Sequence, residues 1–201
     1  MKWMVSTFCA CLLWAGACAA EPFPALYDVS GVAADDVLNV RRTPESGADL
    51  LGTLAPDLRG VEVVATDTSG RWGLVNLGES AGWASLRYLR RQHDNPDYAL
   101  GATLWCSGTE PFWSLRLSQG KSAEFSTPSE TIAIPGVGLI TAGTSRPDRF
   151  FVGLGGGSIT ILRREICSDG MSDQSFGIGI DLLTDHGGVV LYSGCCSVVQ
   201  S

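Results

Sequence analysis

Cysteine is the residue type in this chain whose number and spacing point most directly to a chemistry. Of the seven cysteines among 201 residues, three lie within the first 18 residues, and the second half holds the other four: Cys106, Cys167, Cys195 and Cys196. Four cysteines in an oxidising compartment predict two disulfide bonds. A bond between the neighbours Cys195 and Cys196 would strain the peptide that joins them, so we expect Cys106 and Cys167 each to pair with one of these two.

A zinc site is the alternative chemistry for the same four cysteines. Structural zinc sites commonly take their ligands from C-x-x-C pairs. The second half of the sequence contains no such pair. We therefore favour disulfides and expect neither a metal nor a cofactor.

Three carboxylates lie close in sequence to these cysteines. Glu110 belongs to Gly108-Thr-Glu-Pro-Phe-Trp113, and Asp169 and Asp173 belong to Cys167-Ser-Asp-Gly-Met-Ser-Asp173. If the fold brought them together, they would suit a calcium ion or acid–base catalysis. Calcium takes six or more oxygens, usually from a denser loop, so we favour a turn at Asp169 and the start of a strand at Glu110.

A complete catalytic set is missing from the sequence. Of the two histidines, His93 lies in a polar segment and His186 follows Asp185 in a turn-like stretch. A Ser-His-Asp triad would need a G-x-S-x-G turn for its serine, which is absent, and bridged cysteines leave no free thiol nucleophile. We expect a protein that is not an enzyme. The alternative is an envelope hydrolase or metal-dependent enzyme that uses Glu110, Asp169, Asp173 or His186.

Composition limits the partners of this chain. Its formal net charge is -7, so the chain lacks the excess of positive charge that is typical of proteins that bind nucleic acid or an anionic membrane surface. With 45% hydrophobic residues and 25 glycines, it suits one or two compact domains with many turns.

The first 19 residues have the pattern of a secretory signal peptide. Lys2 precedes an apolar stretch at 5–14, and a small-residue cleavage site ends at Ala19. The sequence therefore predicts a periplasmic or secreted protein. A lipid anchor at Cys18 is the alternative, which Ala15 disfavours because lipoprotein signals usually carry Leu there. No later run is long and apolar enough to span a membrane.

Short alternating segments separated by turn residues fill residues 25–91. Their period of two predicts strands at 25–29, 37–42, 50–54, 61–65, 71–77 and 82–86. Since no helical period interrupts them, we expect a small antiparallel barrel.

Several motifs of this region resemble the bacterial SH3-like domain. They occur in the family's order: Leu38-Asn-Val-Arg41, Leu51-Gly-Thr-Leu54, Val61-Glu-Val-Val64, Gly70-Arg-Trp72, Gly82-Trp-Ala84 and Tyr88-Leu89. Ala84 replaces the usual Val. The resemblance implies a binding module of exported bacterial proteins, some of which bind peptidoglycan peptides. Many others have no known ligand.

Aromatic residues of this module are the candidates for a ligand site. On the strand at 71–77, Trp72 lies on one face and Val75 on the other, so a buried Val75 leaves Trp72 partly exposed. Trp72 and Tyr88 would then form the walls of a peptide groove, with Arg41 available to a carboxylate. Trp83 completes the candidate ligand-binding set. The simpler interpretation is that Trp72 and Trp83 only cap the barrel.

A polar segment at 90–97 separates this module from a second domain at 101–201. Short apolar runs between turns predict another all-β unit, an antiparallel sandwich or barrel held by disulfides. Phe112 and Trp113 are expected to anchor its core. The segments Gly108–Trp113 and Cys167–Asp173 resemble motifs of an uncharacterised family of exported bacterial proteins, which implies a compartment and no chemistry.

These observations favour an exported binding or interaction protein of the bacterial envelope. The SH3-like module would engage a peptidoglycan peptide or an envelope protein, without nucleic acid and without a membrane span. A structural or assembly role without a small ligand is the remaining alternative.

Overall fold

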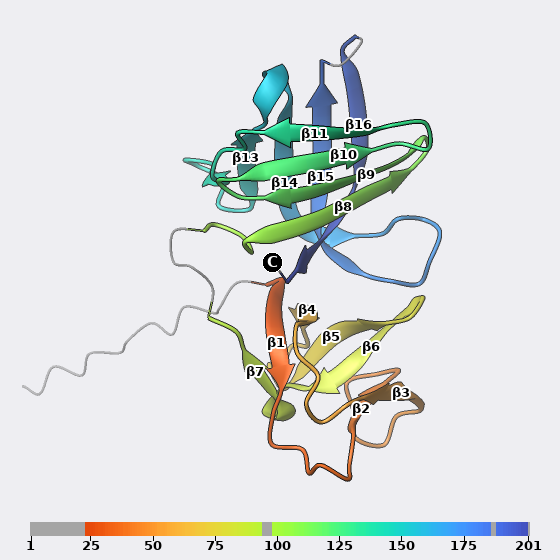
Figure 1. The fold of residues 1–201 in the computed structure, drawn as a ribbon. Coiled ribbons are helices and arrows are strands. Elements are labelled where there is room, and N and C mark those ends of the chain that lie inside the picture. Colours follow the sequence, from red (N-terminus) through yellow and green to blue (C-terminus); the bar gives the residue numbers. More distant parts are fainter. Residues whose placement is uncertain (1–22, 94–97, 186–187, 201) are drawn as a thin grey trace, which may run out of the picture.

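The computed structural model describes residues 23–93, 98–185 and 188–200, and it consists almost entirely of β-strands (Figure 1). Two antiparallel sheets follow one another along the chain, which confirms the predicted all-β fold. The expected signal peptide, with Cys18, and His186 lie outside the described residues. Within the described ranges, no helix is long and apolar enough to cross a membrane.

The first sheet has seven strands in the spatial order β3-β2-β6-β5-β4-β1-β7. They are β1 (Ala25–Val29), β2 (Leu38–Arg41), β3 (Leu50–Leu54), β4 (Val61–Thr66), β5 (Trp72–Leu77), β6 (Ser80–Ser85) and β7 (Leu89–Arg91), with the 3-10 helix η1 (Leu86–Tyr88) before β7. Residue alternation directs Val40, Val63, Val75 and Ala84 into one core, where they are fully buried. The edge strands β3 and β7 do not pair with each other, so the sheet is not a closed barrel. We call this part the N-terminal domain (residues 23–93).

The second sheet has nine strands in the order β11-β10-β9-β8-β16-β15-β14-β13-β12. They are β8 (Thr103–Thr109), β9 (Phe112–Ser118), β10 (Ser122–Ser126), β11 (Thr131–Pro135), β12 (Thr141–Ala142), β13 (Arg149–Gly153), β14 (Ile159–Cys167), β15 (Phe176–Thr184) and β16 (Val190–Val199), with the 3-10 helix η2 (Gly155–Gly157) before β14. The first and last strands, β8 and β16, pair at the centre of the sheet. We call this part the C-terminal domain (residues 98–200).

One hydrophobic core fills the C-terminal domain. Leu115 of β9 and Phe125 of β10 share it with Leu162 of β14 and Ile180 of β15, so the two halves of the sheet face each other across buried side chains. The edge strands β11 and β12 are not paired with each other. This packing is consistent with the predicted sandwich.

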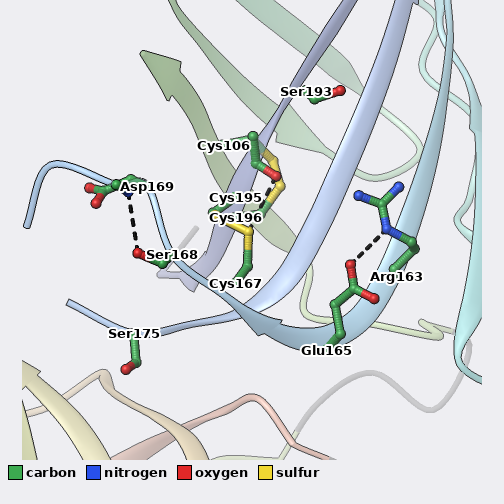
Figure 2. Close-up of a disulfide and its surroundings, with 12 residues drawn as sticks. Cys106, Arg163, Glu165, Cys167, Ser168, Asp169, Ser175, Ser193, Cys195 and Cys196 are labelled. Carbon is green, nitrogen blue, oxygen red and sulfur yellow. Dashed lines mark hydrogen bonds and ion pairs between the residues drawn. A yellow bond between two sulfur atoms is a disulfide. The ribbon is translucent and has the colours of Figure 1, made fainter. Parts of the chain in front are cut away.

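Each of the two disulfides joins β16 to a different strand (Figure 2). Cys106 of β8 bonds to Cys196 across paired strands, with 3.9 Å between their Cα atoms. Cys167, at the end of β14, bonds to Cys195, with 5.7 Å between Cα atoms. The prediction that Cys106 and Cys167 each pair with one of the two neighbours is confirmed.

The two domains pack against each other. Leu26 of β1 is buried in the core of the C-terminal domain, although its strand belongs to the N-terminal sheet. On the other side of the junction, the loop 168–175 reaches the hairpin between β5 and β6, as the blue loop beside the yellow strands in Figure 1 shows. The N–H of Asp173 donates to the carbonyl of Glu79 at 2.9 Å, and the N–H of Ala81 donates to the carbonyl of Asp173 at 3.0 Å.

Candidate functional site

A groove of 590 Å³ on the N-terminal domain contains three of the four predicted ligand-binding residues. Arg41 comes from the end of β2, Trp72 from the start of β5 and Tyr88 from η1. The loop between β1 and β2 supplies further lining residues, including the exposed Val37. The volume lies within the range typical of ligand pockets, about 300–1,000 Å³.

Trp72 is held at the groove by the turn that precedes it. Val75 is fully buried on the opposite face of β5, so alternation places Trp72 on the outer face, half-buried. One carboxylate oxygen of Asp67 accepts the N–H groups of Arg71 and Trp72, each at 2.9 Å. The hydroxyl of Ser69 also donates to Asp67. These bonds, that of Ser69 foremost, lower the pKa of Asp67 to about 2.

A second cleft adjoins the groove at Trp72. It has a volume of 410 Å³ and shares Ser46, Trp72 and Ser85 with the first, while Pro44, Glu45 and Arg71 belong to it alone. Trp72 therefore lines both adjoining depressions.

The groove carries charges of both signs. Arg41 donates from Nη1 to the carbonyl of Ala48 at 2.7 Å, which fixes the guanidinium at the rim. Arg87 lies over the ring of Tyr88, 5.6 Å from the ring centroid. Asp36 contributes a carboxylate from the loop between β1 and β2. The site combines aromatic surface, cations and one anion.

Trp83 does not line this groove. It is half-buried on β6, in register with Leu74 of β5 and Arg41 of β2.

The two motifs of the C-terminal domain meet at a cleft of 390 Å³. Gly108, Thr109 and Phe112 line it from one motif, and Asp169 and Met171 line it from the other. Phe112 is 57% exposed, so the prediction that it anchors the core is wrong. Alternation explains this, because inward residues at 113, 115 and 117 leave position 112 facing outward.

Trp113 is buried, as predicted for a core anchor. Its ring packs against Phe125 and Tyr192, with centroids 6.2 Å and 5.8 Å away. A Cβ at position 108 would collide with the indole nitrogen of Trp113 and with the carbonyl of Ser193, so only glycine fits there.

Of the three motif carboxylates, Asp169 stabilises a turn. Asp169 accepts the N–H groups of Met171 and Ser172 through one oxygen, each at 3.0 Å, which is the predicted turn. Partial burial opposes the lowering of its pKa, but these N–H bonds prevail, and the pKa is below the usual value. Glu110 and Asp173 are exposed, and neither lines the cleft. Among the described residues, no three His, Cys, Asp or Glu side chains are grouped to hold a metal ion.

Comparisons with protein-family models, with curated proteins and with solved structures found no match to this chain. The geometry of the two domains is therefore the basis for the function proposed below.

Sequence reasoning missed two features that the structure brings together. The loop 168–175 carries a motif and also links the domains: Asn76 donates to the carbonyl of Ser175 at 2.8 Å and accepts its N–H at 3.0 Å. Glu62, on the alternating strand β4, points into the same junction. A charged residue in an alternating strand normally indicates a solvent-facing position, so the sequence held no signal for its burial.

Proposed function

We propose that this chain is an exported binding protein of the bacterial envelope, whose N-terminal domain is an SH3-like module. Its ligand is an extended peptide, such as a peptide of the cell wall, which lies across Trp72. The motifs from Leu38-Asn-Val-Arg41 to Tyr88-Leu89 support the module, and two disulfides fit an oxidising compartment.

The observation that carries this proposal is the position of Trp72 between two adjoining clefts. A compact ligand would need only one of them, whereas an extended chain can occupy both and stack on the ring between them. Aromatic residues that are half-buried at the centre of a site typically supply most of the binding free energy.

The charges along the groove suit a peptide with free ionic groups. Arg41 is fixed by Ala48 and retains further N–H groups for a carboxylate. Asp36, on the loop between β1 and β2, suits an amine. Peptides of the cell wall carry both groups.

Co-sedimentation of the mature, oxidised protein with purified peptidoglycan tests the proposal. We expect the wild type to sediment, and Trp72→Ala to bind at least about 10-fold more weakly because the central aromatic contact is lost. Trp105→Ala is the matched control, since Trp105 is a 43% exposed tryptophan on the other domain. Circular dichroism establishes that both variants fold.

Two outcomes would contradict the proposal. If wild type stays in the supernatant and also ignores soluble wall peptides, the groove has another ligand class. If the two tryptophan variants lose binding equally, Trp72 has no special role and the site lies elsewhere.

A further inference from the structure

A carboxylate of the N-terminal domain is inserted into the contact with the C-terminal domain. Glu62 lies on β4 in register with Leu26 of β1, and Leu26 is buried in the C-terminal core. The residue as a whole is half-buried, but its carboxylate lies against β16 and accepts the N–H of Val198 at 2.7 Å. The Ser197 side chain is a second hydrogen-bond partner.

We infer that the junction between the two domains is a pH-responsive clamp, held more firmly at acidic than at neutral pH, with Glu62 as the titrating group. The inference is independent of the ligand proposed for the Trp72 groove. It depends on the carboxyl being enclosed only while the domains are packed together.

The surroundings of Glu62 supply hydrogen bonds and little charge. A cleft of 480 Å³ at the junction is lined by Glu62, Asn76, Phe176, Ser197 and residues of the loop before β4, among them Arg59. Within this described lining, Arg59 is the one other charged residue.

Charges on neighbouring elements are engaged with other partners. Asp28 of β1 accepts the N–H of Gly60 at 3.2 Å and the amide of Gln92 at 2.7 Å, and Arg59 lies close enough to act on its titration. Arg116 of β9 donates to the carbonyl of Gln200.

Burial of the carboxylate raises the pKa of Glu62 to about 7, against the opposing effect of the bonds from Val198 and Ser197. If the domains separate, water reaches the carboxyl and its pKa returns to the ordinary value of 4.5. The packed form then binds the proton more tightly than the separated form. The stabilisation that this proton gives the packed form is fully present below pH 4.5. It declines as pH rises from 4.5 to 7 and is lost above 7.

This difference in proton affinity changes the packing equilibrium by up to about 300-fold across that interval. An exported protein meets the pH of its surroundings directly, so the clamp would respond to external acidification. Asn76 lines the same cleft, and its bonds to Ser175 do not titrate, so they act on the junction at any pH.

The test combines two measurements on the mature, oxidised chain between pH 4 and pH 8. The first is an NMR titration of the Glu62 side-chain carboxyl. The second is the hydrogen-exchange protection factor of the Val198 amide, with the amide of Ile180, inside the second sheet, as the internal reference.

We expect Glu62 to titrate well above pH 4.5 and Val198 to lose protection by 10-fold or more as pH rises. Glu62→Gln keeps the oxygen that accepts the Val198 N–H but cannot titrate, so its Val198 protection should not change with pH. Glu45→Gln removes an exposed carboxylate of the same domain and should behave as wild type.

A Glu62 titration near pH 4.5 would overturn the inference, as would Val198 protection that is independent of pH in wild type. The same pH profile in wild type and Glu62→Gln would assign the effect to another group. If the Gln variant does not fold, the wild-type titration still decides.

Discussion

One aspartate organises the turn before Trp72, and another organises the loop 168–175. Asp67 accepts the N–H of Trp72 at the groove, and Asp169 folds the loop that reaches the neighbouring domain. Both carboxyls have a lowered pKa because hydrogen bonds favour the charged form, from the Ser69 hydroxyl foremost at Asp67 and from backbone N–H groups at Asp169, where they outweigh partial burial. Sequence reasoning found the turn at Asp169 from its Asp-Gly pair, which is a local signal.

Asp67 should make the groove sensitive to acid. Its pKa is about 2 in the folded chain against an ordinary 3.8, so its stabilising contribution is present above pH 3.8 and is lost as pH falls toward 2. We expect thermal unfolding of Asp67→Asn to depend less on pH than that of wild type between pH 5 and pH 2. Asp57→Asn, at an exposed position, is the control. Parallel curves for wild type and Asp67→Asn would contradict this role.

Elements built on a period of two could be predicted well from the sequence, because alternation depends only on nearest neighbours along a strand. The same rule, applied to Trp113, Leu115 and Leu117, would have placed Phe112 outside. Pairing between distant strands could not be predicted, since the contact of β8 with β16 joins segments with no local signal for each other.

The disulfides should differ in how much they stabilise the C-terminal domain. Cys106 and Cys196 are 90 residues apart, and Cys167 and Cys195 are 28 apart. In the chain-entropy model these loops correspond to about 4.5 and about 3.5 kcal/mol. We expect Cys106→Ala/Cys196→Ala to lower the free energy of unfolding in urea by more than Cys167→Ala/Cys195→Ala. The reverse order would show that the shorter loop has a role beyond entropy, for example in holding the loop 168–175.

At the scale of the whole molecule, the two domains behave as one packed unit. Leu26, on a strand of the N-terminal sheet, packs into the core of the C-terminal domain. The loop 168–175 of the C-terminal domain forms backbone hydrogen bonds with the hairpin between β5 and β6. Neither contact was predictable, because each joins surfaces that are outward-facing within their own domain. The only hint was a strand, Ala25–Val29, with apolar residues on both faces.

Leu26→Ala should uncouple the domains. Truncating a buried leucine typically costs about 2–5 kcal/mol, and here the loss falls on the junction. We expect calorimetry to show one unfolding transition for wild type and two for the variant. Leu50→Ala, at a 55% exposed position of the same sheet, is the matched control. A single, unshifted transition for Leu26→Ala would indicate that the domains are coupled by other contacts.

The central place of β16 also affects how a newly made chain matures. Synthesis proceeds from the N-terminus, so Cys106 and Cys167 are both made before Cys195 and Cys196. During that interval the only thiols among these four that can oxidise together are Cys106 and Cys167, a pair that the folded molecule does not contain. Correct maturation therefore requires either that oxidation wait for the last strand or that an early wrong bond be exchanged.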